Sequence, residues 1–170
     1  MMARAHPEFA LRPFLIEDTP LLAEIFRASI EELTAEDYSD GARRAWASAA
    51  DDEEAFAKRL TDQLTLIVTM NGSPVGFASL ANNETIDLIY VHPGLAGQGA
   101  GTMLVDALEK LSAARGAKSL TADVSDTAQD FFGKRGFTAQ QRNTVLRGGE
   151  WLANTTMEKQ TGREKADGQA

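Results

Sequence analysis

Residues 86–104, IDLIYVHPGLAGQGAGTML, limit the fold of this chain more than any other stretch. Their first six residues alternate with the two-residue period of a β-strand. Ile86, Leu88 and Tyr90 are expected to share one face, and Asp87 is expected on the opposite face. Pro93 ends the strand, because proline cannot donate a ladder hydrogen bond. The segment therefore predicts a strand, then a glycine-rich turn, then a helix.

Three glycines, Gly97, Gly99 and Gly101, fall at alternate positions where the helix is expected to begin. Glycine lets backbone N–H groups approach a bound group without obstruction from a side chain. The start of a helix adds unpaired N–H groups and the positive end of the helix dipole. Together these features predict a binding site for a phosphate-like anion. A tight turn with incidental glycines is the alternative interpretation.

Two common phosphate-binding motifs fit this stretch poorly. A P-loop ends in Gly-Lys-Ser/Thr, but the first lysine after the glycines is Lys110. A dinucleotide fingerprint places its third glycine three positions after the second, whereas Gly101 follows Gly99 by two. Asp123 could imitate the acidic residue that binds ribose in such folds. A dinucleotide-binding oxidoreductase therefore stays open as a weaker alternative.

Composition favours a single domain and excludes several kinds of site. The chain has 170 residues, 43% of them hydrophobic, and contains no cysteine, which excludes disulfides and fits a reducing cytoplasm. No apolar run approaches a membrane span, and residues 1–10 lack the apolar centre of a signal peptide. Two distant histidines give no spacing for a metal site. The net charge of −8 argues against a nucleic-acid partner and mildly favours amine substrates.

Alternation and turn signals predict an α+β chain with about seven strands and four helical regions. The strands are expected at residues 9–16, 64–70, 74–80, 86–91, 120–124, 137–147 and 151–159. Asn71-Gly72 is a strong signal for a tight hairpin between the second and third strands. The helical regions are expected at residues 19–33, 42–62 (in two short pieces), 101–116 and 126–136. A helix joins strands 86–91 and 120–124, so these two are expected to run parallel.

The glycine loop resembles the acyl-coenzyme A binding motif of the GNAT superfamily of N-acetyltransferases. That motif reads Arg/Gln-x-x-Gly-x-Gly/Ala and follows a Val-His-Pro-like step. Here residues 96–101 read AGQGAG after Val91-His92-Pro93, and Ala96 departs from the pattern. Residues 128–137, AQDFFGKRGF, resemble the family's Ala-x-x-Phe-Tyr-x-x-x-Gly-Phe signature. The Tyr-Ser and Ala-Trp pairs around residues 38–46 are similar to a poorly characterised bacterial subgroup of the family.

The resemblance covers residues 11–159 and implies a GNAT-like fold. In that fold a mixed, mostly antiparallel sheet of about seven strands is splayed at its parallel pair, with about four helices flanking it. We therefore expect one acyltransferase domain at residues 9–159, followed by a disordered tail at residues 160–170. Family members often dimerise through the later strands, so a homodimer is one expected state.

The resemblance also implies acetyl-CoA as the cofactor and a set of residues that bind it. The pantetheine arm is expected to pair with strand backbone, and the pyrophosphate is expected on the glycine loop. The implied cofactor-binding residues are Ile89, Tyr90, Val91, Gly97, Gln98, Gly99, Ala100, Gly101, Thr102, Phe131 and Phe132. The Thr102 hydroxyl either adds to the pyrophosphate site or simply caps the helix.

The reaction implied by the resemblance is direct acetyl transfer to the primary amine of a small molecule. The amine must arrive neutral, and Asp87 or Glu84 is the candidate base. The family's usual proton donor to the leaving thiolate is a tyrosine, but Phe132 stands at that position. Tyr90, Tyr38 and water are the candidates to replace it, although the favoured interpretation of Tyr90 is an ordinary inward-facing strand aromatic.

The acceptor site is the least determined by the sequence. Tyr38 and Trp46 are candidates to wall it, or else they pack a short helix onto the core. Arg142 or Arg147 is a candidate to hold an acidic acceptor, if they are not simply solvated. Because Phe132 and Ala96 both depart from the family pattern, a catalytically weak CoA-binding sensor or scaffold is the alternative function.

Overall fold

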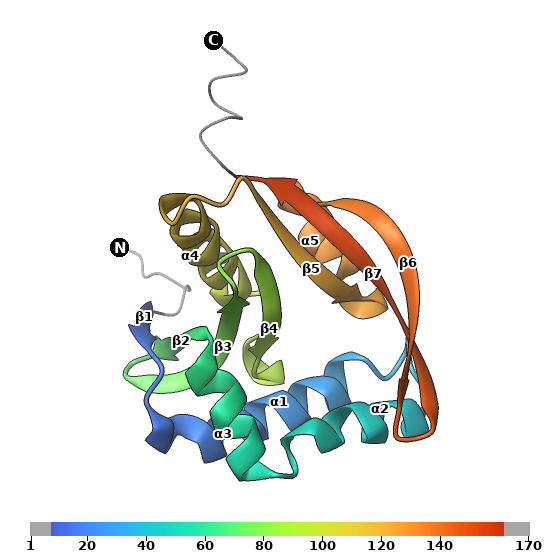
Figure 1. The fold of residues 1–170 in the computed structure, drawn as a ribbon. Coiled ribbons are helices and arrows are strands. Elements are labelled where there is room, and N and C mark those ends of the chain that lie inside the picture. Colours follow the sequence, from blue (N-terminus) through green and yellow to red (C-terminus); the bar gives the residue numbers. More distant parts are fainter. Residues whose placement is uncertain (1–7, 162–170) are drawn as a thin grey trace, which may run out of the picture.

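The computed structural model describes residues 8–161, which form one seven-stranded sheet with the strand order β1-β2-β3-β4-β5-β7-β6 (Figure 1). Its strands are β1 (Phe9–Pro13), β2 (Leu64–Met70), β3 (Ser73–Ala81), β4 (Thr85–Val91), β5 (Ser119–Ser125), β6 (Thr138–Arg147) and β7 (Glu150–Gln160). The pair β4–β5 is parallel and every other neighbouring pair is antiparallel. The predicted α+β class and mixed sheet are confirmed.

Five α-helices flank the sheet. They are α1 (Thr19–Leu33), α2 (Asp40–Ala47), α3 (Glu53–Asp62), α4 (Ala100–Ala114) and α5 (Gln129–Lys134), with short 3₁₀ turns η1 (Ile16–Asp18), η2 (Ser48–Ala50), η3 (Pro93–Leu95) and η4 (Asp126–Ala128). Helices α4 and α5 pack on one face, while α1 and α3 pack on the other. Helix α2 lies against the hairpin of β6 and β7 (Figure 1).

Local turn chemistry sets the register of the antiparallel strands. Asn71 and Gly72 have φ values of 53° and 89°, the left-handed values that a two-residue hairpin turn needs. Asn82 and Asn83, with φ values of 54° and 63°, make the turn from β3 into β4. The predicted hairpin between β2 and β3 is therefore confirmed. Its turn has positive φ values, which asparagine and glycine adopt more readily than other residues do.

The parallel pair β4–β5 is joined over a very short length. Thr85 pairs with Thr121 and Ile86 with Ala122, and no further pair follows within the described residues. Strand β5 continues beside β7 as far as Ser125, so β4 and β5 diverge after Ala122 (Figure 1). The backbone edge of β4 beyond Ile86 therefore faces the gap rather than another strand.

A β-bulge in β4 changes which side chains lie on each face of the strand, compared with the faces predicted from the sequence. Ile86 pairs with Leu80 while Leu88 pairs with Ser79, so Asp87 is the extra residue of the bulge. Ile86 packs in the core under α4, whereas Leu88 packs in the core under α1 and α3. Asp87 contacts α3 and lies on the same side as Leu88. The prediction that Asp87 lies opposite Leu88 was wrong, because the strict two-residue alternation fails at a bulge.

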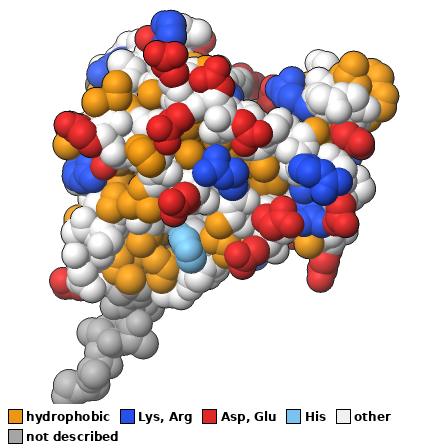
Figure 2. Space-filling view, turned by 90° about the horizontal axis from the view of Figure 1, so that it is seen from below, with side chains coloured by type: hydrophobic (Ala, Val, Ile, Leu, Met, Phe, Trp, Pro, Cys, Tyr) orange, Lys and Arg blue, Asp and Glu red, His pale blue; other side chains and the backbone are white. Residues whose placement is uncertain are grey.

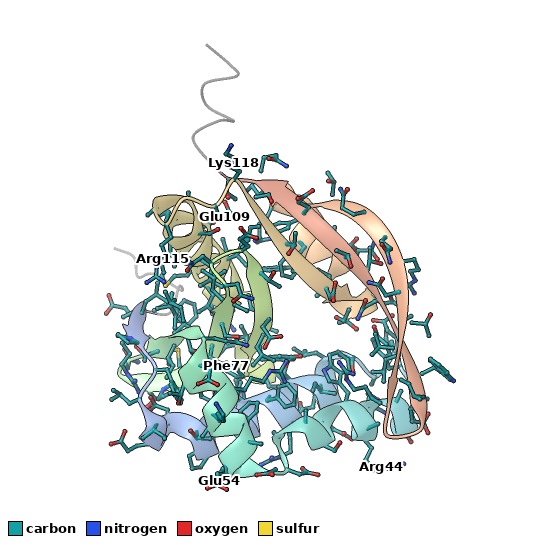
Figure 3. The ribbon with its side chains drawn as sticks, in the orientation of Figure 1. Arg44, Glu54, Phe77, Glu109, Arg115 and Lys118 are labelled. Atoms are coloured by element: carbon teal, nitrogen blue, oxygen red, sulfur yellow. The ribbon has the colours of Figure 1, made fainter. Side chains whose placement is uncertain are left out.

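The sheet separates two apolar cores. One, under α4 and α5, contains Leu104, Leu108 and Phe132, and the other, under α1 and α3, contains Phe26 and Phe77. Phe77 is fully buried, with its ring centroid 5.9 Å from that of Tyr90 (Figure 3). Burial of these large side chains holds both helical layers on the sheet.

Several expected boundaries shift at the ends of the domain. β1 ends at Pro13 rather than Ile16, and Asp18 is the N-cap residue of α1 but makes no side-chain hydrogen bond to that helix. Its carboxylate instead accepts hydrogen bonds from Arg12 at 2.8 and 2.9 Å. β7 continues to Gln160, one residue past the expected domain end, and residues 162–170 of the predicted tail lie outside the described range. Within residues 8–161, no helix combines the length and apolarity needed to cross a bilayer.

Replacing Phe77 with alanine should remove a central contact of the core under α1 and α3. We expect Phe77→Ala to lower the free energy of unfolding by about 3–5 kcal/mol, as measured by urea denaturation. The control is Ile16→Ala, because Ile16 is 62% exposed, and it should change stability by less than about 0.5 kcal/mol. Equal losses in the two variants would contradict this account of the core.

Candidate active site

The three glycines at the start of α4 are required for two different structural reasons. Gly97 and Gly99 have φ values of 78° and 103°, and nothing lies within 4 Å of where their Cβ atoms would be. They are needed for backbone conformation and leave the loop surface open. Gly101 is helical, and a Cβ there would lie 3.1 Å from the Phe131 ring. Gly101 therefore allows α4 and α5 to pack closely.

The start of α4 presents unpaired backbone donors. Residues 99–102 have no acceptor four positions earlier within the helix, and among the described residues no other group accepts their N–H hydrogens. Gly99 is exposed and Gly101 and Thr102 are partly exposed and line a cavity, whereas Ala100 is buried. The predicted anion site therefore has the open geometry that it requires.

A cavity of about 640 Å³ runs from this loop into the gap between β4 and β5. It is lined by residues of both strands, of the glycine loop and of α5. The predicted cofactor residues among its lining are Ile89, Tyr90, Val91, Gly97, Gly99, Gly101, Thr102, Phe131 and Phe132. Gln98 and Ala100 are not in the lining, although both belong to the loop. The split of the sheet therefore opens into a space of the size that cofactor sites have.

Arg135 is a cation beside the loop that the sequence reasoning missed. Its guanidinium lies 3.9 Å from the Phe131 ring centroid and lines the large cavity. It donates to Thr102 Oγ1 from Nε at 3.1 Å and also from Nη2. Because the Thr102 oxygen accepts these bonds, its own O–H proton is left to donate elsewhere. The signal was present, since Arg135 stands inside the recognised 128–137 segment at a position that the motif leaves open.

Phe132 occupies the place of the expected proton donor and has no polar atom. It is buried, with its ring centroid 5.4 Å from that of Phe131 and 5.0 Å from that of Phe137. This ring therefore packs α5 onto the core and lines the large cavity without offering a proton.

Tyr90 lies where the two halves of the sheet separate and keeps its hydroxyl proton. Trp46 Nε1 donates to the Tyr90 hydroxyl at 3.2 Å, so the oxygen is an acceptor there and its proton remains available. Burial raises the pKa of Tyr90 to about 12. A phenol with that pKa is a poor acid toward a thiolate of pKa about 8.5, but it is a good neutral hydrogen-bond donor.

The Tyr38 hydroxyl ties three elements together. It donates to the Ala153 carbonyl at 2.6 Å and accepts from the Asp126 N–H at 2.9 Å. Burial raises the pKa of Tyr38. Its proton is engaged by a carbonyl, so Tyr38 is less suited than Tyr90 to replace the missing donor. Its ring packs edge-on against Trp46, with centroids 5.3 Å apart.

The two candidate bases differ in position. Asp87 accepts from Arg59 at 2.8 and 3.0 Å and from Gln63 at 2.9 Å. Burial acts to raise the pKa of Asp87, but these hydrogen bonds and the Arg59 charge outweigh it, so the pKa lies below its ordinary value. Such a carboxylate is a weak proton acceptor. Glu84 is exposed at the turn before β4 and lines neither cavity. A base role for either residue stays a prediction.

A second cavity of about 200 Å³ lies on the side of α3 and the β6–β7 hairpin. Both predicted acceptor residues, Tyr38 and Trp46, line it. The residues that line both cavities are Trp46, Asp87, Tyr90, Asp123 and Ser125. The two cavities therefore meet where β4 and β5 separate.

The surface of the molecule carries mixed charge. Figure 2 shows acidic and basic side chains interspersed with apolar ones on the face seen from below, rather than gathered by sign. Among the described residues, no group of three or more acidic, histidine or cysteine side chains is arranged to hold a metal ion. The charges that bear on ligand binding are therefore those around the two cavities.

Comparison with known proteins identifies this arrangement. Residues 34–161 match the family model described as an acetyltransferase (GNAT) domain. The chain belongs to the GNAT family. GNAT enzymes are N-acetyltransferases and use acetyl-CoA, so the predicted enzyme class and cofactor are confirmed at the level of the family.

Individual GNAT relatives span a wide range of similarity. A crystal structure from Rhodopseudomonas palustris, named as a GCN5-related N-acetyltransferase: aminotransferase, class-II, is 60% identical, with a TM-score of 0.89 over 94% of this chain and 99% of that one. The peptidyl-lysine N-acetyltransferase YjaB of Salmonella typhimurium is 31% identical over 76% of this chain and 83% of its own. The PaiA N-acetyltransferase of Thermoplasma acidophilum, solved with coenzyme A, shares the fold at 21% identity, with a TM-score of 0.75 over 90% of this chain and 99% of that one.

The ion pair of Asp87 predicts a pH-dependent contribution to stability. The pKa of Asp87 is lowered in the folded protein, so its contribution to stability is complete above the unfolded pKa of about 3.9 and is lost as the pH falls below that value through the lower pKa of the folded state. We expect Asp87→Asn to cost about 1 kcal/mol at pH 7, because Arg59 is partly exposed, and less below pH 4.

Urea denaturation of both proteins from pH 3 to pH 8 measures this difference. Asp62→Asn is the control, because Asp62 pairs with Lys58 on the exposed surface of α3 and should cost less. A cost of Asp87→Asn that does not change with pH would contradict the role of the ionised carboxylate.

Arg135 should contribute to holding the phosphates of acetyl-CoA. We expect Arg135→Ala to raise the Kd for acetyl-CoA about tenfold in calorimetry, since charge-assisted hydrogen bonds contribute about 1.5–3 kcal/mol. The loss should shrink at high salt, which screens exposed charges. The neighbouring Lys134 is exposed and lines neither cavity, so Lys134→Ala is the matched control. Equal effects of the two changes would rule out a specific contact by Arg135.

Proposed function

We propose that this protein transfers an acetyl group directly from acetyl-CoA to the primary amine of a small molecule. The observation that carries the proposal is the meeting of the two cavities at the split between β4 and β5. The larger cavity leads to the free N–H groups at the start of α4, which suit a diphosphate. The smaller one is bounded by aromatic side chains, which suits a compact acceptor.

The chain's own groups position the two reactants. Bound acetyl-CoA supplies an activated acetyl thioester. The backbone edge of β4 from Asp87 to Val91 has no strand partner on the β5 side and offers hydrogen bonds to the pantetheine arm. Residues 99–102 and Arg135 face the phosphates. The thioester is thereby directed toward the junction of the two cavities, where Tyr90 and Trp46 lie.

Acetyl transfer requires protons to be removed from the amine and one proton to be supplied to the leaving thiolate at the junction of the two cavities. A carbon–nitrogen bond forms and the carbon–sulfur bond breaks, so an ammonium gives up two protons and the thiolate takes up one. The Tyr90 O–H is placed to donate a hydrogen bond at the junction, and water carries protons to and from it. Because thiols ionise near pH 8.5, the thiolate leaves at an appreciable rate without a strong acid. The absence of a tyrosine at position 132 should therefore slow transfer rather than prevent it.

A lysine side chain of a protein is the main alternative acceptor, as in the name of the YjaB relative. The small volume of the acceptor cavity and the hairpin beside it favour a free small amine. A homodimer and a cytoplasmic location stay predictions from the sequence. The exposed pair Leu146 and Trp151 on the β6–β7 hairpin is where we expect a dimer contact.

Release of free thiol from acetyl-CoA across a panel of primary amines and a lysine peptide tests the proposal. We expect turnover with at least one small amine and loss of acetyl-CoA binding by about 100-fold or more in Gly99→Asp, which sets a carboxylate against phosphate. Gly72→Asp is the control, because Gly72 also has a positive φ in open space. Binding without thiol release would favour the sensor, and turnover of the peptide alone would redirect the proposal to protein lysines.

A further inference from the structure

The smaller cavity contains one charged pair that is internally balanced and two charges that are not. Asp87 and Arg59 neutralise each other through two hydrogen bonds. Asp123 and Arg147 also line this cavity, and neither forms an ion pair with any described residue. Both residues are exposed at the edge of the cavity, where a ligand of matching charge can reach them.

Asp123 lies at the reacting end of the cavity. It follows Ala122, the last residue of β5 that pairs with β4, and it lines both cavities. Asn143 Nδ2 donates to Thr156 Oγ1 at 2.8 Å, and Thr156 Oγ1 donates to Asp123 Oδ1 at 2.6 Å. These two hydrogen bonds hold the Asp123 carboxylate in place, and no group within residues 8–161 is seen to donate to its second oxygen, Oδ2. A primary ammonium bound there would stand beside the predicted position of the thioester.

Arg147 supplies the opposite charge at the end of β6. The other arginine of the hairpin, Arg142, donates to Asp126 at 2.6 and 3.1 Å and to Thr155 at 3.0 Å, so Asp126 already balances its charge. Arg147 has no recorded hydrogen bond or ion pair with the described residues, and it lines the smaller cavity. Its planar fork of donors suits a carboxylate.

We propose that the acceptor is a zwitterion that places its ammonium on Asp123 and its carboxylate on Arg147, with a spacer between the two charges, because Asp123 pairs with Thr156 and Arg147 with Glu150, six residues apart on β7. This inference rests on the proposed acetyltransferase function. The apolar part of the acceptor contacts the walls of the cavity, which include Trp46, Tyr90 and Leu152. Asp87 takes no part in binding the acceptor, because Arg59 already compensates its charge.

The test compares free amino acids with their carboxamides, which keep the amine but lack the carboxylate. The assay measures thiol release at saturating acetyl-CoA, and the series includes α-amino acids and amino acids with longer spacers. We expect at least a tenfold higher kcat/KM for the best acid than for its amide. Arg147→Ala should remove that preference by lowering kcat/KM for the acid about tenfold while leaving the amide within twofold. Arg44→Ala, an exposed change on α2, should alter neither (Figure 3).

Asp123→Asn should lower kcat/KM at least tenfold for acid and amide alike, while the Kd for acetyl-CoA stays within twofold. Asp106→Asn, at an exposed position of α4, is its control and should leave both values unchanged. Circular dichroism and thermal melts confirm that each variant is folded.

The possible outcomes separate this inference from the proposed function. Failure of the wild type to bind acetyl-CoA would remove both. Turnover of acids and amides at equal rates, an unchanged acid preference in Arg147→Ala, or unchanged kinetics in Asp123→Asn would overturn the inference alone. Intact acetyl-CoA binding without thiol release from any amino acid would overturn it as well.

Discussion

Two pairs of residues, Thr85 with Thr121 and Ile86 with Ala122, join the halves of this sheet in parallel. Beyond them β5 stays with β7 while β4 stays with β3, so the strands must part. Backbone groups left unpaired inside a protein are costly, which means that a ligand able to pair with them is favoured there. The cavities, the placement of Tyr90 and the approach to the glycine loop all follow from that early separation.

The bulge at Asp87 supports the same opening. One extra residue twists β4 and turns a carboxylate toward α3, where Arg59 and Gln63 bind it. The ion pair connects the splayed strand to a helix on one face, and the Tyr38 hydroxyl connects the hairpin to η4 on the other side of the gap. Each half of the split sheet therefore has its own attachment, which keeps the opening from depending on the two parallel pairs alone.

The sequence predicted most of the fold because the relevant signals are local. Asn71-Gly72 determines its own turn, and the alternation of the strands needs no knowledge of neighbours. The bulge was missed because it depends on how β4 aligns with β3. The contacts of Arg135 with Thr102 and of Asp123 with Thr156 were not predicted, because each joins residues that lie 33 positions apart in the sequence. The glycine turn before α4 was predicted correctly as local structure, although Gly101 turned out to serve helix packing.

The position of Trp46 has a consequence for the order of events. Trp46 lines both cavities together with residues of β4 and β5, whereas the glycine loop and α5 contribute only to the larger cavity and the β6–β7 hairpin only to the smaller one. If acetyl-CoA occupies the larger cavity and the acceptor the smaller one, as proposed, their bodies lie in separate volumes and touch only at the junction. Such an enzyme can hold both in a ternary complex and follow a sequential kinetic scheme, with no need for an acetylated side chain between two half-reactions.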